Sequence, residues 1–302
     1  RQPQEGNIRL TVMTGRGAVT AEQAIENREK LTEDGFCVVG QVLSHDFLDE
    51  LRRETDRLLD TATSRQELLT PRARAANSGL QYQGSDLHLR REDGELIDRL
   101  INWQPAIDAL LAMGLDDFES HGSFILLSKP PGGPRLYWHH DWMDWNDPIS
   151  LAPWPQKIFL SYYLHDTLGN NGCFQIIPGS HRKRIDLHDE LERAQQDSDE
   201  ATNIHFLEHD ERSVEFREHP NQVDVPVKAG DLVIGEARAL HAARANSSDT
   251  RRSLLLGWFE RPRNTVPGYW QHAVPKEILK RDNDVAFGTT RNPGRNLVEH
   301  DR

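Results

Sequence analysis

Residues 123–142 read SFILLSKPPGGPRLYWHHDW and contain two short β-like runs, 123–128 and 136–141, on either side of a Pro-Pro-Gly-Gly turn signal. Further runs of this kind, separated by Gly, Pro and Asn, are 157–164, 173–177, 222–227, 231–234 and 253–259. Many short strands with turns between them favour an antiparallel sandwich or barrel over alternating strands and helices. We therefore predict a mainly β fold with flanking helices, a cupin-like jelly roll or double-stranded β-helix.

The sequence before this core predicts helices and one short strand. The predicted elements are a helix over 21–31, a strand over 36–39, a helix over 46–59 and a helix over 94–113. Asp34-Gly35 separates the first helix from the strand, and Ser44 can cap the second helix. The third helix is expected to break near Pro105, because proline cannot donate a backbone hydrogen bond.

We predict that the whole chain is one domain. Its predicted parts are a helical N-terminal part at about 20–115, a jelly-roll core at about 118–260 and a polar insertion at about 182–220, all within a single domain over 1–302. The insertion contains DLHDELERAQQDSDEA, which we expect to form an exposed helix. Residues 61–94 are polar and Arg-rich and predict a loop. Whether this loop or the insertion forms a lid is left open by the sequence.

The composition argues against several classes of partner. The chain has 302 residues, 36% hydrophobic and 28% charged, and 48 acidic against 36 basic residues give a net charge of −12. Without a long basic run, nucleic acid and anionic membranes are poor partners. The two cysteines form no zinc or disulfide pattern, no apolar stretch is long enough for a membrane helix, and the start RQPQEGNIRL lacks the charged-then-apolar layout of a secretory signal. We expect a soluble, cytoplasmic protein.

Two possible metal ligands lie close together in the sequence LYWHHDWMDW. His139 and Asp141 are two residues apart in a segment of strand character, so both side chains should point to one face. His241 lies in a later apolar segment and can supply a third ligand. Two histidines and one carboxylate form the facial triad of non-haem iron(II), which leaves positions open for a keto acid and dioxygen.

The same His-x-acid spacing occurs twice more, at His188-x-Glu190 and His209-x-Glu211. Both pairs lie in the polar insertion, where an exposed helix or loop offers no enclosed pocket. We therefore interpret them as solvated side chains. An arginine pair, Arg251 and Arg252, precedes the last strand, and because side chains alternate along a strand only one of them can face inward. A guanidinium suits the far carboxylate of a keto acid, because it forms two parallel hydrogen bonds.

Several segments together resemble the phytanoyl-CoA dioxygenase family of iron(II)- and 2-oxoglutarate-dependent oxygenases. Besides the His139-x-Asp141 pair, the matching segments are LTEDGFCVVGQVLSHDFLDELRRETDRL at 31–58, NGCFQIIPGSHR at 171–182, AGDLVIGEARALH at 229–241 and NSSDTRR at 246–252. The resemblance implies Fe(II), 2-oxoglutarate and O2 as cofactor and co-substrates. It also implies that the arginine eleven residues after His241, which is Arg252, binds 2-oxoglutarate, and that Ser161 and Tyr163 contribute to the same pocket.

The resemblance further implies hydroxylation of a small molecule with release of succinate and CO2. Related halogenases replace the carboxylate ligand with a small residue, whereas this chain keeps Asp141. Another oxidation by the same site, such as desaturation or ring closure, is an alternative. Because no basic cluster offers a place for the phosphates of coenzyme A, we expect a small metabolite or natural-product intermediate. Side chains near the ligand pair that could contact it are Trp138, Trp142, Asp144 and Trp145.

Two other classes of function remain in competition. One is a catalytically inactive jelly-roll ligand-binding protein, which would typically have lost part of the triad or the arginine. The other is a zinc hydrolase, because zinc also accepts two histidines and a carboxylate, although Arg252 has no obvious role there. The sequence leaves open the identity of the substrate and the oligomeric state.

Overall fold

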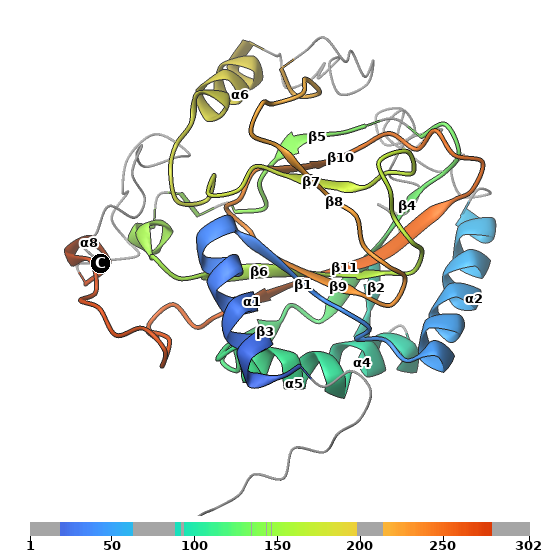
Figure 1. Cartoon of the computed structure of the whole chain (residues 1–302), viewed down its shortest axis with the longest axis horizontal. Coiled ribbons are helices and arrows are strands. Elements are labelled where there is room, and N and C mark those ends of the chain that lie inside the picture. Colours follow the sequence, from blue (N-terminus) through green and yellow to red (C-terminus); the bar gives the residue numbers. More distant parts are fainter. Residues whose placement is uncertain are drawn as a thin grey trace, which may run out of the picture.

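Two antiparallel sheets lie face to face and enclose the interior of the molecule (Figure 1). The computed structural model describes residues 19–62, 88–91, 94–133, 135–142, 144–145, 147–197 and 214–279. The larger sheet has the order β1-β9-β6-β11-β4-β2, with β3 paired to β11, and the smaller sheet has the order β5-β10-β7-β8. Strands that are neighbours in the sheets are far apart in the chain, which confirms the predicted jelly roll.

The strands agree closely with the sequence prediction. Their bounds are β1 Phe36–Val39, β2 His88–Arg90, β3 Glu119–Ser120, β4 Ser123–Lys129, β5 Leu136–His139, β6 Lys157–Tyr163, β7 Phe174–Ile176, β8 Val223–Val225, β9 Leu232–Glu236, β10 His241–Ala243 and β11 Arg252–Glu260. All eight predicted strands are present, with ends that differ by no more than two residues. The prediction missed β2, β3 and β10, because each is only two or three residues long and has little β propensity.

Side chains on the larger sheet alternate between two apolar environments. On the outer face, Phe124, Leu160 and Leu255 pack in the cluster that includes the helices. On the inner face, Phe159 and Leu254 pack against Phe174 of the smaller sheet. Both faces are therefore buried, and the inner face is the floor on which a site between the sheets can be built.

Helices α1, α2, α4 and α5 cover the outer face of the larger sheet, and helix ends follow local sequence signals (Figure 1). Their bounds are α1 Ala21–Asp34, α2 His45–Ala62, α4 Glu95–Ile101, α5 Gln104–Ala112, α6 Asp186–Asp197 and α8 Lys276–Leu279, with a 3-10 helix η3 at Pro148–Leu151. Ser44 Oγ accepts a hydrogen bond from the Phe47 backbone N–H at 3.3 Å, as predicted for its cap. The predicted 94–113 helix is divided into α4 and α5, and Pro105 lies in the first turn of α5.

Helix α6 differs from the expected exposed helix. Its residues Leu187 and Leu191 pack with Trp138 and Leu240 of the smaller sheet, so one face of the helix is buried. His188 is only 4% exposed, and its Nδ1 accepts the Ile185 backbone N–H at 3.0 Å. The prediction that this helix is exposed was wrong for this face, because its leucines recur at helical spacing within an otherwise polar segment.

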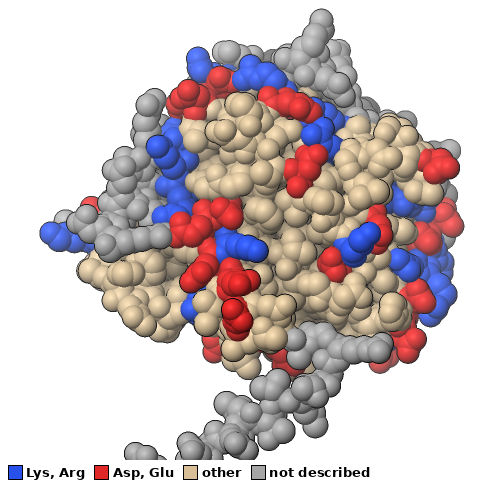
Figure 2. Space-filling view, in the orientation of Figure 1, with Lys and Arg blue, Asp and Glu red and all other residues tan. Residues whose placement is uncertain are grey.

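Parts of two predicted segments lie outside the described residues. These parts are 63–87 and 92–93 of the expected loop at 61–94, and 198–213 of the insertion, which includes His209-x-Glu211. On the face of the molecule shown in Figure 2, basic and acidic side chains are interspersed. None of the described helices combines the length and the apolar character needed to cross a membrane.

Gly235 on β9 provides a test of the packing beside the inner face. A Cβ at this position would lie 2.0 Å from Cζ of Phe159, whose ring is 5.0 Å from that of His241. We expect Gly235→Ala to lower the free energy of unfolding by about 1–3 kcal/mol, because the interior cannot accept the added methyl group. Gly268→Ala is the control, since no atom lies within 4 Å of its Cβ position. Equal Tm values for the two variants would contradict this packing.

Candidate metal centre

Strand pairing brings the two histidines together. In the antiparallel pair of β5 and β10, His139 lies directly opposite His241, and the register shifts one step further along. Strand β5 ends at His139, and the next turn is fixed because the backbone N–H of Asp141 donates to Ala237 O at 2.7 Å. Asp141 thus follows the strand rather than lying on it, a local correction to the predicted alternation. Its side chain still reaches the same point as the histidines.

The three side chains offer a compact set of ligand atoms. His139 Nε2 is 3.7 Å from Asp141 Oδ1, and His241 Nε2 is 3.9 Å from Asp141 Oδ2. One ligand atom from each residue can be chosen so that all lie within 4.8 Å of one another. A single ion between them would be coordinated from one side, which is the arrangement that non-haem iron(II) uses.

Backbone carbonyls fix the protonation of both rings. His139 Nδ1 donates to Tyr137 O at 2.9 Å, and His241 Nδ1 donates to Ala239 O at 3.0 Å. Because a carbonyl only accepts, the proton is on Nδ1 and the lone pair of Nε2 faces the other ligands. Burial lowers the pKa of His139, and burial together with the neighbouring His139 lowers the pKa of His241 to about 4. Both rings are therefore neutral at pH 7, the form that binds metal.

Asp141 is held as a carboxylate by its neighbours. Burial alone would raise its pKa, but His241, His139, the Trp258 indole and Lys157 together lower it. The indole Nε1–H of Trp258 donates to Asp141 Oδ2 at 2.9 Å. Sequence reasoning missed Trp258, although its even spacing from Arg252 places both on the inner face of β11. This hydrogen bond orients the ligand carboxylate from the opposite sheet.

The two adjacent arginines point to opposite faces of β11. Arg251 Nη1 lies 3.5 Å from Asp56 and Nη2 lies 3.7 Å from Asp60, both on α2. Arg252 is 5% exposed, and its Nη2 donates to Gly172 O at 2.5 Å. Its Nε is buried without a hydrogen-bond partner. The structure therefore directs Arg252 inward, in agreement with the alternation expected from the sequence.

A second buried cation, Lys129, lies beside Arg252. The two are cross-strand partners on β4 and β11, and Lys129 is 2% exposed. Its Nζ donates to Arg244 O, while burial and the nearby Arg252 and Arg135 lower its pKa well below the usual value. Within the described ranges no carboxylate forms an ion pair with either cation. Two desolvated cations without a counter-ion fit an anionic ligand, such as the far carboxylate of 2-oxoglutarate.

The structure places the remaining predicted pocket residues on β6. Ser161 and Tyr163 are buried, and both share the inward register of Phe159. Tyr163 is close enough to Arg252 for the two to interact electrostatically, while burial raises the pKa of its hydroxyl. Their contribution to binding 2-oxoglutarate stays a prediction. Lys129 was not predicted, although it continues the inward alternation of Leu127 on β4.

The tryptophans near the ligand pair have structural contacts. Trp138 packs under α6 and donates from Nε1 to Arg217 O at 2.8 Å, and Trp142 donates to Ser150 Oγ at 3.0 Å. Trp145 is buried, with its ring 5.1 Å from that of His140. These contacts account for the burial of the three rings without a substrate. Asp144 is partly exposed and forms an ion pair with Arg263.

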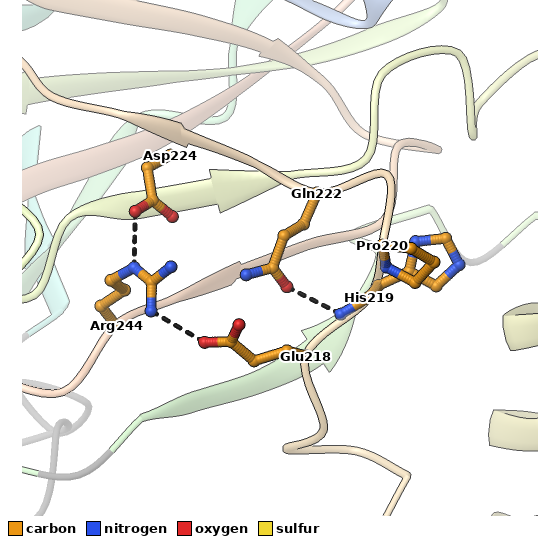
Figure 3. Close-up of a pocket in the computed structure, with 6 residues that line it drawn as sticks. All are labelled: Glu218, His219, Pro220, Gln222, Asp224 and Arg244. Atoms are coloured by element: carbon orange, nitrogen blue, oxygen red, sulfur yellow. Dashed lines mark hydrogen bonds and ion pairs between the residues drawn. The ribbon is translucent and has the colours of Figure 1, made fainter.

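A separate pocket of about 650 Å³ lies at the edge of the smaller sheet. Its lining residues are Glu218, His219, Pro220, Gln222, Asp224 and Arg244 (Figure 3). Arg244 is neutralised there by Asp224 at 2.6 Å and Glu218 at 2.9 Å. Because these charges satisfy one another, and no triad residue lines it, this pocket carries no part of the metal centre.

A jelly roll that holds two neutral histidines and a carboxylate on one side of a common point has the site of a non-haem iron protein. The sequence model of the phytanoyl-CoA dioxygenase family matches residues 31–254, and the chain belongs to this family. The suspected resemblance is thereby confirmed.

Individual relatives are distant. An ectoine dioxygenase of Streptomyces coelicolor is 24% identical over 157 residues, which are 51% of this chain and 50% of that protein. The chain thus spans about half the length of that relative. An ectoine dioxygenase of Bordetella bronchiseptica is 22% identical over 89% of this chain and 86% of its own length. The solved structure of the epimerase SnoN with Fe3+, alpha-ketoglutarate and nogalamycin RO has a TM-score of 0.52 at 18% identity, covering 84% of this chain and 93% of that one. This likeness supports the fold.

Trp258→Phe tests the hydrogen bond that orients Asp141. The substitution keeps an aromatic ring but removes the N–H, so we expect the affinity for Mn(II) or Co(II) to fall about 10- to 100-fold. The affinity can be measured by metal titration of the metal-free protein. Trp270→Phe is the control, because the Trp270 Nε1 has no hydrogen-bond partner. An unchanged affinity in Trp258→Phe would show that Asp141 is oriented without the indole.

Proposed function

We propose that this protein is an iron(II)- and 2-oxoglutarate-dependent dioxygenase that hydroxylates an unactivated C–H bond of a small metabolite or natural-product intermediate, with release of succinate and CO2. The observation that carries the proposal is the combination of the His139, Asp141 and His241 triad with the buried side chains of Arg252 and Lys129, which form no ion pair with a described carboxylate. The triad is explained by binding of iron, and the two basic side chains are explained by binding of 2-oxoglutarate.

Different residues would bind the metal and the co-substrate. His139, Asp141 and His241 would hold iron from one side, which leaves the other side to small molecules. A ferrous ion supplies the activation of dioxygen that drives the oxidative decarboxylation of 2-oxoglutarate. Arg252 and Lys129 would anchor the far carboxylate of the co-substrate, so that its keto-acid end is directed toward the triad. Ser161 and Tyr163 would line the space between.

Apolar side chains on the inner face protect the site from water. The rings of Phe159 and Phe174 lie 5.0 Å and 5.8 Å from the ring of His241. A dry environment strengthens the interaction of Arg252 with a carboxylate and prevents side reactions with water. Gly172 leaves room at the anchor, because a Cβ there would lie 2.8 Å from Lys129 Cδ and 3.0 Å from Arg252 Nη2.

The competing functions explain less of the site. A zinc hydrolase would use the triad but gives no role to the buried pair of cations. An inactive ligand-binding protein would not need the neutral, oriented histidines. Desaturation or ring closure by the same residues stays an alternative outcome of the same chemistry. A cytoplasmic location and a small-molecule substrate also stay proposals.

The identity of the metal can be tested by reconstitution. We expect metal-free protein to form succinate from 2-oxoglutarate in air after addition of Fe(II) but not Zn(II), because only iron can transfer electrons to dioxygen. Succinate can be quantified by mass spectrometry across a broad substrate panel, with His241→Ala as the inactive control. Hydrolysis that is restored by Zn(II), without succinate, would overturn the proposal.

The adjacent arginines provide a matched test of the co-substrate anchor. We expect Arg252→Gln to weaken binding of 2-oxoglutarate at least about tenfold, because a charge-assisted pair with a carboxylate is lost. Arg251→Gln should leave binding unchanged, since it removes only ion pairs with Asp56 and Asp60 on the outer face. The affinity can be read anaerobically from the visible absorption of the Fe(II)–2-oxoglutarate chelate. Equal losses in both variants would contradict the assignment.

A further inference from the structure

Lys157 lies at the metal end of the inner face. It is the first residue of β6 and shares the inward register of Phe159, Ser161 and Tyr163. Its backbone carbonyl accepts from the Ala237 N–H at 2.9 Å, and the Ala237 carbonyl in turn accepts from Asp141 at 2.7 Å. The backbone of Lys157 is therefore fixed through the same residue, Ala237, that fixes the metal-ligand loop.

The side chain of Lys157 also lies beside the metal centre. Its Nζ is 5.8 Å from the centre of the Trp258 ring, the indole that donates to Asp141. The ammonium also acts electrostatically on Asp141. The ammonium therefore lies next to an indole that is hydrogen-bonded to one of the three candidate metal ligands.

Lys157 forms no ion pair with a carboxylate of the described residues. Among the described residues no carboxylate oxygen lies within the 4.0 Å of its Nζ that an ion pair requires. The nearest acidic residue by register is its cross-strand partner Glu260, which instead faces Arg263 and His121, each at 3.5 Å. Asp144 and Asp147 are likewise bound by Arg263. Lys157 is partly exposed and remains available to a ligand.

This cation is separate from the co-substrate anchor. Lys157 pairs with Glu260 at one end of β11, whereas Arg252 begins that strand. The six residue steps from Arg252 to Trp258 correspond to roughly 20 Å along a strand. The co-substrate 2-oxoglutarate, a five-carbon diacid, would extend from the triad toward Arg252. It therefore leaves Lys157 free to bind a different anion.

We propose that Lys157 binds an oxyanion of the primary substrate, a carboxylate or a phosphate, so that the enzyme acts on a small anionic molecule. The inference rests on the proposed function, because it assigns the substrate class of the same site. Trp258 supplies the aromatic surface next to the bound anion. An ammonium with three donors suits a rotating oxyanion, and its pairing in a partly desolvated site gives orientation as well as affinity.

The inference can be tested by binding of simple probes to the loaded protein. Protein saturated with Mn(II) and 2-oxoglutarate is titrated calorimetrically with hexanoate, hexyl phosphate, hexanamide and hexylamine. We expect one or both anions to bind at least about tenfold more tightly than the amide and the amine, which corresponds to about 1.4 kcal/mol. The comparison of hexanoate with hexyl phosphate then distinguishes a carboxylate from a phosphate.

Variants assign the preference to Lys157. Lys157→Gln should abolish the preference for anions, while Lys157→Arg should retain it. Lys228→Gln is the control, because that lysine is 69% exposed and pairs with Asp166 at 3.0 Å. Retained binding of Mn(II) and 2-oxoglutarate, with an unchanged Tm, shows that each variant is folded.

Four outcomes would overturn the inference, and three of them concern how the probes bind. They are equal binding of amide and acids, an anion preference that survives in Lys157→Gln, and anion binding that only displaces 2-oxoglutarate. Failure of both anions to bind, in protein that binds Mn(II) and 2-oxoglutarate, would also overturn it. If the wild-type protein bound neither Mn(II) nor 2-oxoglutarate, the proposed function itself would fail, so the two failures are distinguishable.

Discussion

The antiparallel pairing of β5 with β10 is the constraint from which the metal centre follows. It sets His139 opposite His241. The pairing register then shifts between His241 and Ala243, so the regular hydrogen-bond ladder ends beside the two histidines. Extra residues of this kind bend a strand and re-aim its side chains, and they are common next to active sites. The carbonyl of Ala237 then captures the backbone of Asp141. Pairing on both sides of β10, by β5 and β7, keeps His241 in place although the strand has only three residues.

The larger sheet supplies two polar side chains to the site, Arg252 and Trp258. Strand β11 crosses the whole inner face, with Arg252 at its start and Trp258 near its end. One strand thus carries both the inward cation and the indole that orients the metal-ligand carboxylate. The apolar side chains between them, Leu254 and Leu256, belong to the buried cluster beside Phe159. A single strand with alternating side chains therefore carries both polar residues on one face, with apolar residues between them.

Much of this arrangement could be predicted from local patterns. The spacing of His139 and Asp141, the alternation of Arg251 and Arg252, and the cap at Ser44 each depend on a few neighbouring residues. The hydrogen bond from Trp258 could not be predicted, because it joins residues 117 positions apart, one on β11 and one in the loop after β5. Strand β10 was missed since its residues have little β propensity and its partners hold it in place. The burial of α6 depends on the smaller sheet beneath it, which the polar sequence of the helix does not reveal.

The adjacent burial of Lys129 and Arg252 has a thermodynamic consequence. Burial of two adjacent basic groups disfavours their charged forms in the folded chain, and an anion that binds only the native chain offsets this cost. At a hundredfold excess over its dissociation constant such a ligand stabilises the native state by about 2.7 kcal/mol. The concentration of 2-oxoglutarate would then set the folded fraction of the protein as well as the rate of its reaction. A low concentration would reduce both.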